Sequence, residues 1–146
     1  MADPQTLVRR FVEDFLGRGD LAAADETAHE RIQGITGLKP TGPIDGRDEY
    51  KATIAAFVDA FPAAGPLRII DQFASADGTR VVTRFQSPQR HAKAFFGVAA
   101  TNRVILFDET HVARVQDGLI VENIVSATNL EFEMLMAPVL TPMILK

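Results

Sequence analysis

The stretch RVILFDETHVARVQDGLIVENIVSAT, residues 103–128, decides the fold. Two runs rich in β-branched and apolar residues, 103–116 and 119–128, flank a turn at Asp117 and Gly118. Such runs around an Asp-Gly pair predict two long antiparallel strands joined as a hairpin. Charged and polar side chains interrupt both runs, so the same hairpin is the first place to look for a functional site.

The register of this hairpin follows from its loop. We interpret residues 116–118 as a three-residue loop, a type I turn closed by glycine in the left-handed region. Counting back from that loop, His111 lies opposite Asn123, and Glu109 lies opposite Val125. Directly opposed side chains in a sheet are close neighbours, so the polar groups are predicted to gather in one place.

The two faces of the predicted hairpin differ in composition, because side chains alternate along a strand. One face is apolar with a single polar group, and it is predicted to hold Ile105, Phe107, Glu109, His111, Ala113, Val121, Asn123, Val125 and Ala127. The other mixes charged residues with Val104, Leu106, Val112, Ile120 and Ile124. This second face is too apolar to be left in water across a whole sheet, which predicts a homodimer.

Helices are predicted ahead of the strands, at 4–17, 20–31 and 47–61. In the first, apolar residues recur at helical spacing, and Asp3 followed by Pro4 is typical of a helix start. Asp20 is predicted to cap the second helix. Three helices followed by consecutive strands indicate an α+β domain, a cone-shaped curved antiparallel sheet whose three N-terminal helices close a hydrophobic cavity.

The remaining elements are read from turn signals and apolar runs. Residues 34–46 hold four glycines and two prolines and are predicted to be a loop. The apolar tail after 129 is interpreted as a packed terminal segment, with a pocket wall or a dimer contact as the alternative. The other strands are predicted at 67–75, 80–88 and 91–96.

Composition excludes several classes of protein. A length of 146 residues predicts a single domain, 1–146. The net charge of −4 gives no electrostatic reason to expect nucleic acid or an anionic membrane as a partner. The chain has no cysteine, its three histidines lack metal-ligand spacing, and no apolar run reaches membrane-spanning length, so we expect no metal site. No apolar signal core opens the chain, and a cytoplasmic location is expected.

Several stretches together resemble the SnoaL-like polyketide cyclases of the ketosteroid isomerase and nuclear transport factor 2 fold group. They are VRRFVEDFLGRGDLAAADE, PIDGRDEYKATIAAFVDAFP, HAKAFFGVAATNRV and VARVQDGLIVEN, in that order. The resemblance runs over about residues 7–136 and implies the cone-shaped fold, a dimer and a cofactor-free enzyme. Because members of this fold group differ in function, the chemistry has to be argued from the pocket.

This chain departs from the family pattern at the position of its usual acid–base group. The family's fragment ends in an aspartate that moves protons, and Val125 stands there. A polar pair at the end of the family's second helix corresponds to Gln33 and Gly34, whereas the histidine of the preceding strand is kept as His111. In the predicted register Glu109 stands opposite Val125, so its carboxylate is predicted to replace the missing one.

The candidate site combines these residues. Glu109 is predicted to be a general base with His111 as its polarising partner, although a purely structural Glu–His or Glu–Arg pair is the alternative. Asn123 and Gln33 are candidates to bind a substrate oxygen, or else ordinary backbone partners. Substrate-binding walls are predicted at Tyr50, Phe107 and Val125. His91 is interpreted as a mouth or structural residue, and the acidic residues around His29 as a solvated helix face.

Three functions remain open from the sequence. The first is a cofactor-independent enzyme that acts on a hydrophobic, carbonyl-containing, polyketide-like small molecule by acid–base catalysed cyclisation or isomerisation. The second is epoxide opening, which needs at least two carboxylates in the pocket. The third is a non-catalytic protein that binds a small molecule, in which the loss of the aspartate means the loss of the chemistry.

Overall fold

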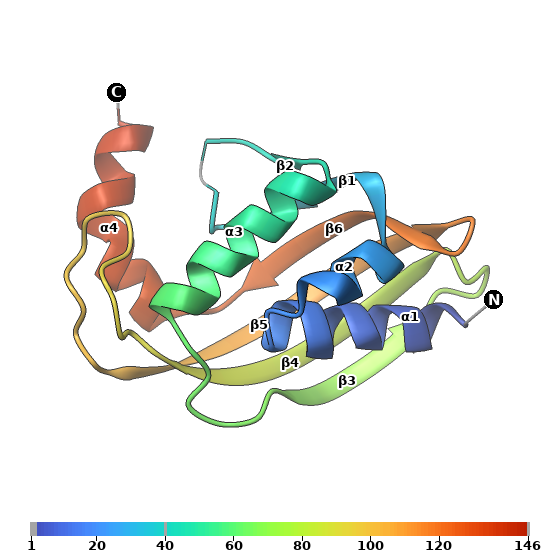
Figure 1. The fold of residues 1–146 in the computed structure, drawn as a ribbon, viewed down its shortest axis with the longest axis horizontal. Coiled ribbons are helices and arrows are strands. Elements are labelled where there is room, and N and C mark those ends of the chain that lie inside the picture. Colours follow the sequence, from blue (N-terminus) through green and yellow to red (C-terminus); the bar gives the residue numbers. More distant parts are fainter. Residues whose placement is uncertain (1–2, 40, 146) are drawn as a thin grey trace.

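Residues 3–39 and 41–145 are described in this computed structural model, and within them six strands form one sheet in the order β2-β1-β6-β5-β4-β3 (Figure 1). The sheet is curved and does not close into a barrel. The α+β class predicted from the sequence is confirmed. The strands are β1 (Ala28–Ile35), β2 (Ile44–Asp45), β3 (Arg68–Ala74), β4 (Arg80–Arg90), β5 (Val104–Gln116) and β6 (Leu119–Ala127).

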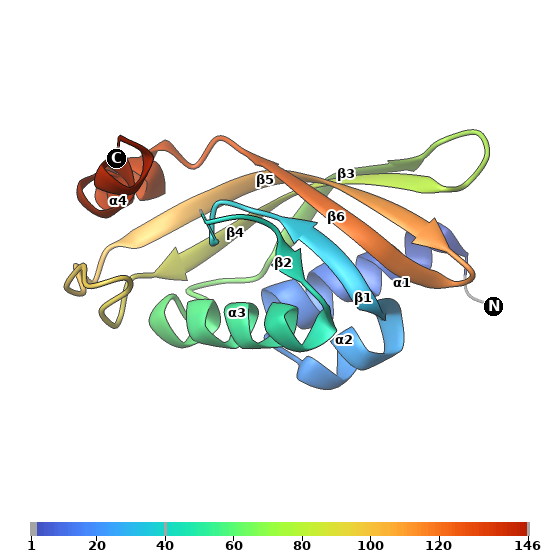
Figure 2. The same cartoon turned by 90° about the horizontal axis from the view of Figure 1, so that it is seen from above.

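Helices α1, α2 and α3 lie on one face of the sheet, and a further helix, α4, lies near one end (Figure 2). Asp3 caps α1 by accepting from the backbone N–H groups of Gln5 and Thr6, and Pro4 follows it. The helical segments are α1 (Pro4–Arg10), the π-helical stretch η1 (Phe11–Gly17) that continues it, α2 (Leu21–Thr27), α3 (Arg47–Ala60) and α4 (Leu130–Ile144). No helix in the described residues is long and apolar enough to cross a membrane.

The helix predicted at 20–31 is correct in its first part and wrong in its last residues. Asp20 does cap α2, its side chain accepting from the N–H of Ala22 at 3.0 Å, but the helix ends at Thr27. Residues 28–35 instead form β1, which pairs parallel with β6 and antiparallel with β2. The sheet is therefore mixed rather than purely antiparallel. The alanine-rich run stays helical, whereas the segment after it pairs with the distant strand β6, and this long-range pairing outweighs local helix preference there.

The hairpin loop is one residue shorter than predicted. Asp117 and Gly118 both have positive φ angles, 53° and 78°, as a two-residue type I′ turn requires, and Gln116 pairs with Leu119. A bulge follows between Arg114 and Val115 on the pairing ladder. The extra residue of the bulge lies in β6, so the register differs from the predicted one along the whole hairpin.

The corrected register changes which residues face one another. His111 pairs with Val125 and Ala113 with Asn123, while Glu109 pairs with Ala127. The predicted opposition of Glu109 and Val125 is therefore wrong. The bulge also turns Ile120, which we placed on the outer face, into the core, where it is fully buried, and Val121 does not take the inward place predicted for it.

Two further segments differ from the prediction. The strand expected at 91–96 is absent from the described structure, and an irregular loop with a single Phe95–Val98 bridge takes its place. The apolar tail forms α4, whose Phe132 and Met136 are buried. The tail thus packs against the domain and also lines a cavity, whereas a dimer contact through it stays a prediction.

Buried apolar side chains form two clusters. The first, here called the inner core, lies between α1, η1, α2, α3 and the sheet, and it includes Phe11, Phe15 and Ile32. The second, here called the α4 cluster, fills the end of the sheet beneath α4; its buried members are Phe57, Ala60, Phe61, Ile105, Phe107, Phe132 and Met136. The candidate site lies where the two clusters meet.

Candidate active site

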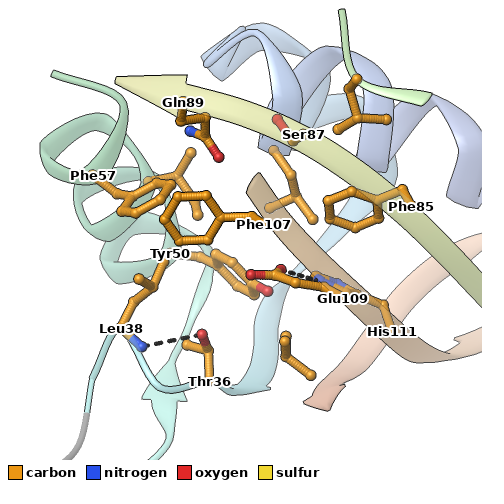
Figure 3. Close-up of a pocket in the computed structure, with 14 residues that line it drawn as sticks. Thr36, Leu38, Tyr50, Phe57, Phe85, Ser87, Gln89, Phe107, Glu109 and His111 are labelled. Carbon is orange, nitrogen blue, oxygen red and sulfur yellow. Dashed lines mark hydrogen bonds and ion pairs between the residues drawn. The ribbon is translucent and has the colours of Figure 1, made fainter. Parts of the chain in front are cut away.

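A cavity of about 40 Å³ lies between α3 and the inner faces of β4, β5 and β6 (Figure 3). Its walls are mostly apolar and aromatic, with the carboxylate of Glu109 and the imidazole of His111 on one side. Tyr50, Ser87 and Gln89 add polar groups around it. We call it the inner cavity, and it has the composition expected of a small-molecule site: an apolar lining with a few polar groups.

A larger cavity of about 210 Å³ lies beside it, beneath the first turns of α4. This outer cavity is lined by Phe132, Asn129 and Leu140 from the α4 end of the molecule. The two cavities share wall residues, namely Thr36, Leu38, Phe107, Glu109 and Val125. Glu109 therefore stands at the boundary between a small inner space and a larger outer one.

Hydrogen bonds hold both carboxylate oxygens of Glu109. Oε1 lies 2.9 Å from Nε2 of His111, and Oε2 accepts from Nδ2 of Asn129 at 2.8 Å. The Glu109 side chain is 19% exposed and that of His111 is 4% exposed, so this pair is largely removed from water. A carboxylate oriented by two N–H donors beside an apolar cavity is suited to accept a proton from a bound molecule.

The network continues from His111 to Tyr50 through Asn123. Nδ2 of Asn123 lies 2.9 Å from Nδ1 of His111 and donates to the Tyr50 hydroxyl at 3.0 Å. Since Nδ1 accepts from this amide, the imidazole proton resides on Nε2, which donates to Glu109. The donors thus run in one direction, from Asn123 through His111 to the carboxylate.

Tyr50 reaches this network because β1 has no side chain in its path. A Cβ added at Gly34 would lie 2.7 Å from Cε2 of Tyr50, so the ring packs directly on the glycine backbone. The edges of Phe11 and Phe15 close around the same ring. Burial raises the pKa of Tyr50 to about 12, so at neutral pH the group is a phenol with a proton to donate.

The sequence-predicted residues divide into two groups in the structure. Glu109, His111, Tyr50, Phe107 and Val125 all line the inner cavity. Asn123 is fully buried behind them and lines neither cavity. Its Nδ2 is used within the protein, and its Oδ1 has no partner among the described residues. Asn123 is therefore not placed to contact a substrate as was predicted; it supports His111 and Tyr50 from behind.

Gln33 does not belong to the site. Its side chain donates to Asp45 at 2.6 Å across the β1–β2 pair, and it lines neither cavity. The error follows from the helix predicted at 20–31, because residue alternation in the strand sends Gln33 outward and Gly34 inward.

The histidines outside this network have structural surroundings. His91 is buried and stacked on Phe61 at 4.6 Å, and its Nδ1 accepts from the backbone N–H of Thr101. Its Nε2 has no partner among the described residues. His29 lies in β1 rather than on a helix beside Asp25, which is paired with Lys51.

Among the polar residues that line the two cavities, Ser87, Gln89 and Asn129 were not predicted from the sequence. Ser87 and Gln89 lie on the inward face of β4; the strand predicted at 80–88 includes Ser87 and ends just before Gln89. Asn129 lies two residues after the end of β6, just beyond the strand predicted at 119–128. Its Oδ1 accepts from the N–H of Asp108, which fixes its Nδ2 toward Glu109. Alternation along β4 could have revealed the first two, but the local sequence contains no signal for the third.

Comparison with known proteins supports this architecture. The model of the family described as SnoaL-like polyketide cyclase matches residues 6–133. A search of curated protein sequences gave no significant match. Among solved structures, a protein of Jannaschia sp. CCS1, provisionally assigned as a SnoaL-like polyketide cyclase, superposes with a TM-score of 0.76 at 15% identity, covering 94% of this chain and 96% of that one.

Two Streptomyces proteins are similar to this chain to the same degree. IdmH of Streptomyces antibioticus, provisionally a polyketide cyclase, has a TM-score of 0.73 at 20% identity, covering 93% of this chain and 99% of its own. AclR of Streptomyces galilaeus, provisionally a hydroxylase, has a TM-score of 0.72 at 21% identity, covering 92% of this chain and 84% of its own. These likenesses concern the fold, which by itself does not fix a chemistry.

The fold is that of a cone-shaped α+β domain with a cavity between its helices and its sheet. Because the family model matches most of the chain, this protein belongs to the SnoaL-like polyketide cyclase family.

Proposed function

We propose that this protein removes a proton from a carbon next to a carbonyl group in an apolar, polyketide-like small molecule, leading to ring closure or isomerisation. The observation that carries the proposal is the placement of Glu109, a carboxylate oriented by two donors at the boundary of two apolar cavities. Glu109 acts as the base in place of the aspartate whose position Val125 occupies.

The developing negative charge on the substrate oxygen needs a donor, and Tyr50 supports that role. Its oxygen accepts from Asn123, which leaves its own proton available to a ligand in the inner cavity. The donation from Asn123 strengthens the phenol as a donor, because linked hydrogen bonds polarise one another. A base on one side of the cavity and a donor on another is the arrangement that enolisation requires.

The sizes of the cavities favour one orientation of the substrate. A dry cavity of about 150 Å³ can bind benzene. The outer cavity of about 210 Å³ therefore has room for a ring, whereas the inner one of about 40 Å³ admits a carbonyl-sized group. In our proposal the carbonyl points toward Tyr50 and the apolar body lies beneath α4.

Exchange of carbon-bound hydrogen tests the proposal without knowledge of the natural substrate. The probe is β-tetralone, a small bicyclic aromatic ketone, incubated in heavy water and followed by proton NMR. We expect the protein to accelerate exchange next to the carbonyl, and Glu109→Gln to lower that rate by about 10²–10⁴-fold, the usual contribution of a positioned acid–base group. Glu131→Gln, the same change on an exposed carboxylate, serves as the matched control.

Two further variants separate the roles within the network. His111→Ala should slow exchange less than Glu109→Gln, because the imidazole orients the base rather than accepting the proton. Adding Val125→Asp to Glu109→Gln should restore part of the rate, since position 125 borders both cavities. If β-tetralone binds but exchanges no faster than with Glu109→Gln, the enzyme proposal is wrong and a binding protein becomes the better description.

A further inference from the structure

Asn129 occupies an unusual position at the junction of β6 and α4. It is the N-cap residue of α4, yet its side chain makes no capping hydrogen bond within the described structure. Asparagine at this position ordinarily accepts from the N–H of the second or third helical residue. Here the side chain turns away from the helix, is 5% exposed, and bonds entirely to β5.

The orientation of the Asn129 amide is set by the backbone. Oδ1 accepts from the N–H of Asp108 at 2.7 Å, one residue after Thr128 N–H donates to the Asp108 carbonyl. The amide thus extends the β5–β6 pairing by one position beyond the end of β6. Because an N–H group can only donate, Oδ1 must face it, and Nδ2 must face Oε2 of Glu109.

We infer that Asn129 is a positioning residue for the base, through which the first turn of α4 holds the Glu109 carboxylate aimed at the cavity. Its N–H group donates to the carboxylate oxygen that His111 leaves free, so the two donors together fix the plane of the carboxylate. The same turn carries Phe132, a wall of the outer cavity. The position of α4 against the sheet and the orientation of the Glu109 carboxylate are therefore linked through the Asn129 side chain. This inference rests on the proposed function of Glu109.

Asn129→Asp tests the inference, because the capping and positioning roles predict opposite results. Aspartate caps helices as well as asparagine and suits the positive end of the helix dipole, so a purely structural role predicts unchanged exchange and an equal or higher melting temperature. A positioning role predicts that the new carboxylate repels that of Glu109, so that the pair retains a proton at neutral pH. The rate of β-tetralone exchange should then fall at least tenfold at neutral pH and recover in alkaline solution.

The matched control is Thr128→Asp, which adds the same charge at the neighbouring, exposed residue. It should leave the pH–rate profile at its original position. A second variant, Asn129→Leu, removes the donor without adding charge, so the acid limb of its profile should move in the same direction but less far. Circular dichroism establishes that each variant is folded, and either Asn129 variant suffices if the other does not fold.

The outcomes distinguish this inference from the function on which it rests. If Glu109→Gln keeps the exchange activity, the proposed function fails. If Glu109→Gln is inactive while both Asn129 variants follow the pH profile of the unmodified protein, the function stands and the role of Asn129 is overturned. A uniform loss of rate at every pH in the Asn129 variants would also overturn it, because that is the signature of structural damage.

Discussion

The inner core and the α4 cluster are both buried, but they are built differently. The inner core is closed by α1, α2 and α3 over the middle of the sheet and includes fully buried Phe11, Phe15 and Ile32. The α4 cluster combines side chains of α3, β5 and α4, and α4 contains Pro138 and Pro142, each of which removes a backbone donor. Buried members of the α4 cluster, Phe107 and Phe132, line the outer cavity. We expect the half around the inner core, which orients Tyr50, to be the more rigid, and the α4 end to be the more adjustable.

The sharpest test of this contrast compares two phenylalanines. Phe15→Ala should lower the free energy of unfolding by about 3–5 kcal/mol, because it leaves a hole in packing that cannot relax. Phe132→Ala should cost less, about 1–3 kcal/mol, since α4 can shift toward the space. Urea unfolding followed by circular dichroism measures both. Equal losses would show that the α4 end is as tightly held as the inner core.

Tyr50 provides a second test, because it is the only tyrosine and the chain has no tryptophan. Its pKa is raised from 10.0 to about 12 on folding, by burial first of all. The folded state therefore holds this proton more tightly, so the stabilisation is complete below pH 10 and is lost as the pH rises toward 12. That loss is on the order of 2 kcal/mol.

Ultraviolet absorbance of the tyrosinate ion measures this titration directly. We expect no tyrosinate near pH 10 while the protein is folded, and a rise only near 12 or on unfolding. The Tyr50→Phe variant should lack the signal and lose less stability in alkali. A titration at the ordinary value in the folded protein would mean that the ring is accessible and that the rigid half is less closed than the structure indicates.

We propose that the protein forms a homodimer through the outer face of its sheet. Apolar residues follow one another across paired strands there, namely Phe73, Val82, Val112, Ile124 and Ile35. Ile124→Lys should place a charge in the middle of this row and give a monomer, with unchanged β-tetralone exchange. Light scattering at tens of micromolar decides the point, because a monomeric unmodified protein at that concentration would refute the dimer.

The smallest expected effect concerns the charges at the α4 end. Lys93 pairs with Asp59 at 2.8 Å and ties the loop after β4 to α3, but the two side chains are 62% and 64% exposed. Lys93→Gln should therefore change the unfolding free energy by about 0.5 kcal/mol or less. A larger loss of unfolding free energy, measured by chemical denaturation, would indicate that ion pairing rather than the α4 cluster stabilises this end of the molecule.

Much of the candidate site could be predicted because it lies on one strand. Alternation along β5 puts Phe107, Glu109 and His111 on the same face whatever the partner strand does, and all three line the inner cavity. Gln33 was misplaced because its assignment depended on a helix ending four residues too late. Asn129 could not be found, since its role depends on where β6 stops and on the backbone of β5.

The sequence by itself determined the α+β class, the helix caps at Asp3 and Asp20, and the inward face of β5, because each follows from local patterns of side chains. The tertiary structure decided the parallel pairing of β1 with β6, the bulge that brings Ile120 into the core, and the contact of Asn129 with Glu109. These features depend on which distant segments meet. Pairing between such segments is chosen by packing and hydrogen bonding of the whole sheet, which outweigh the local preferences of either segment.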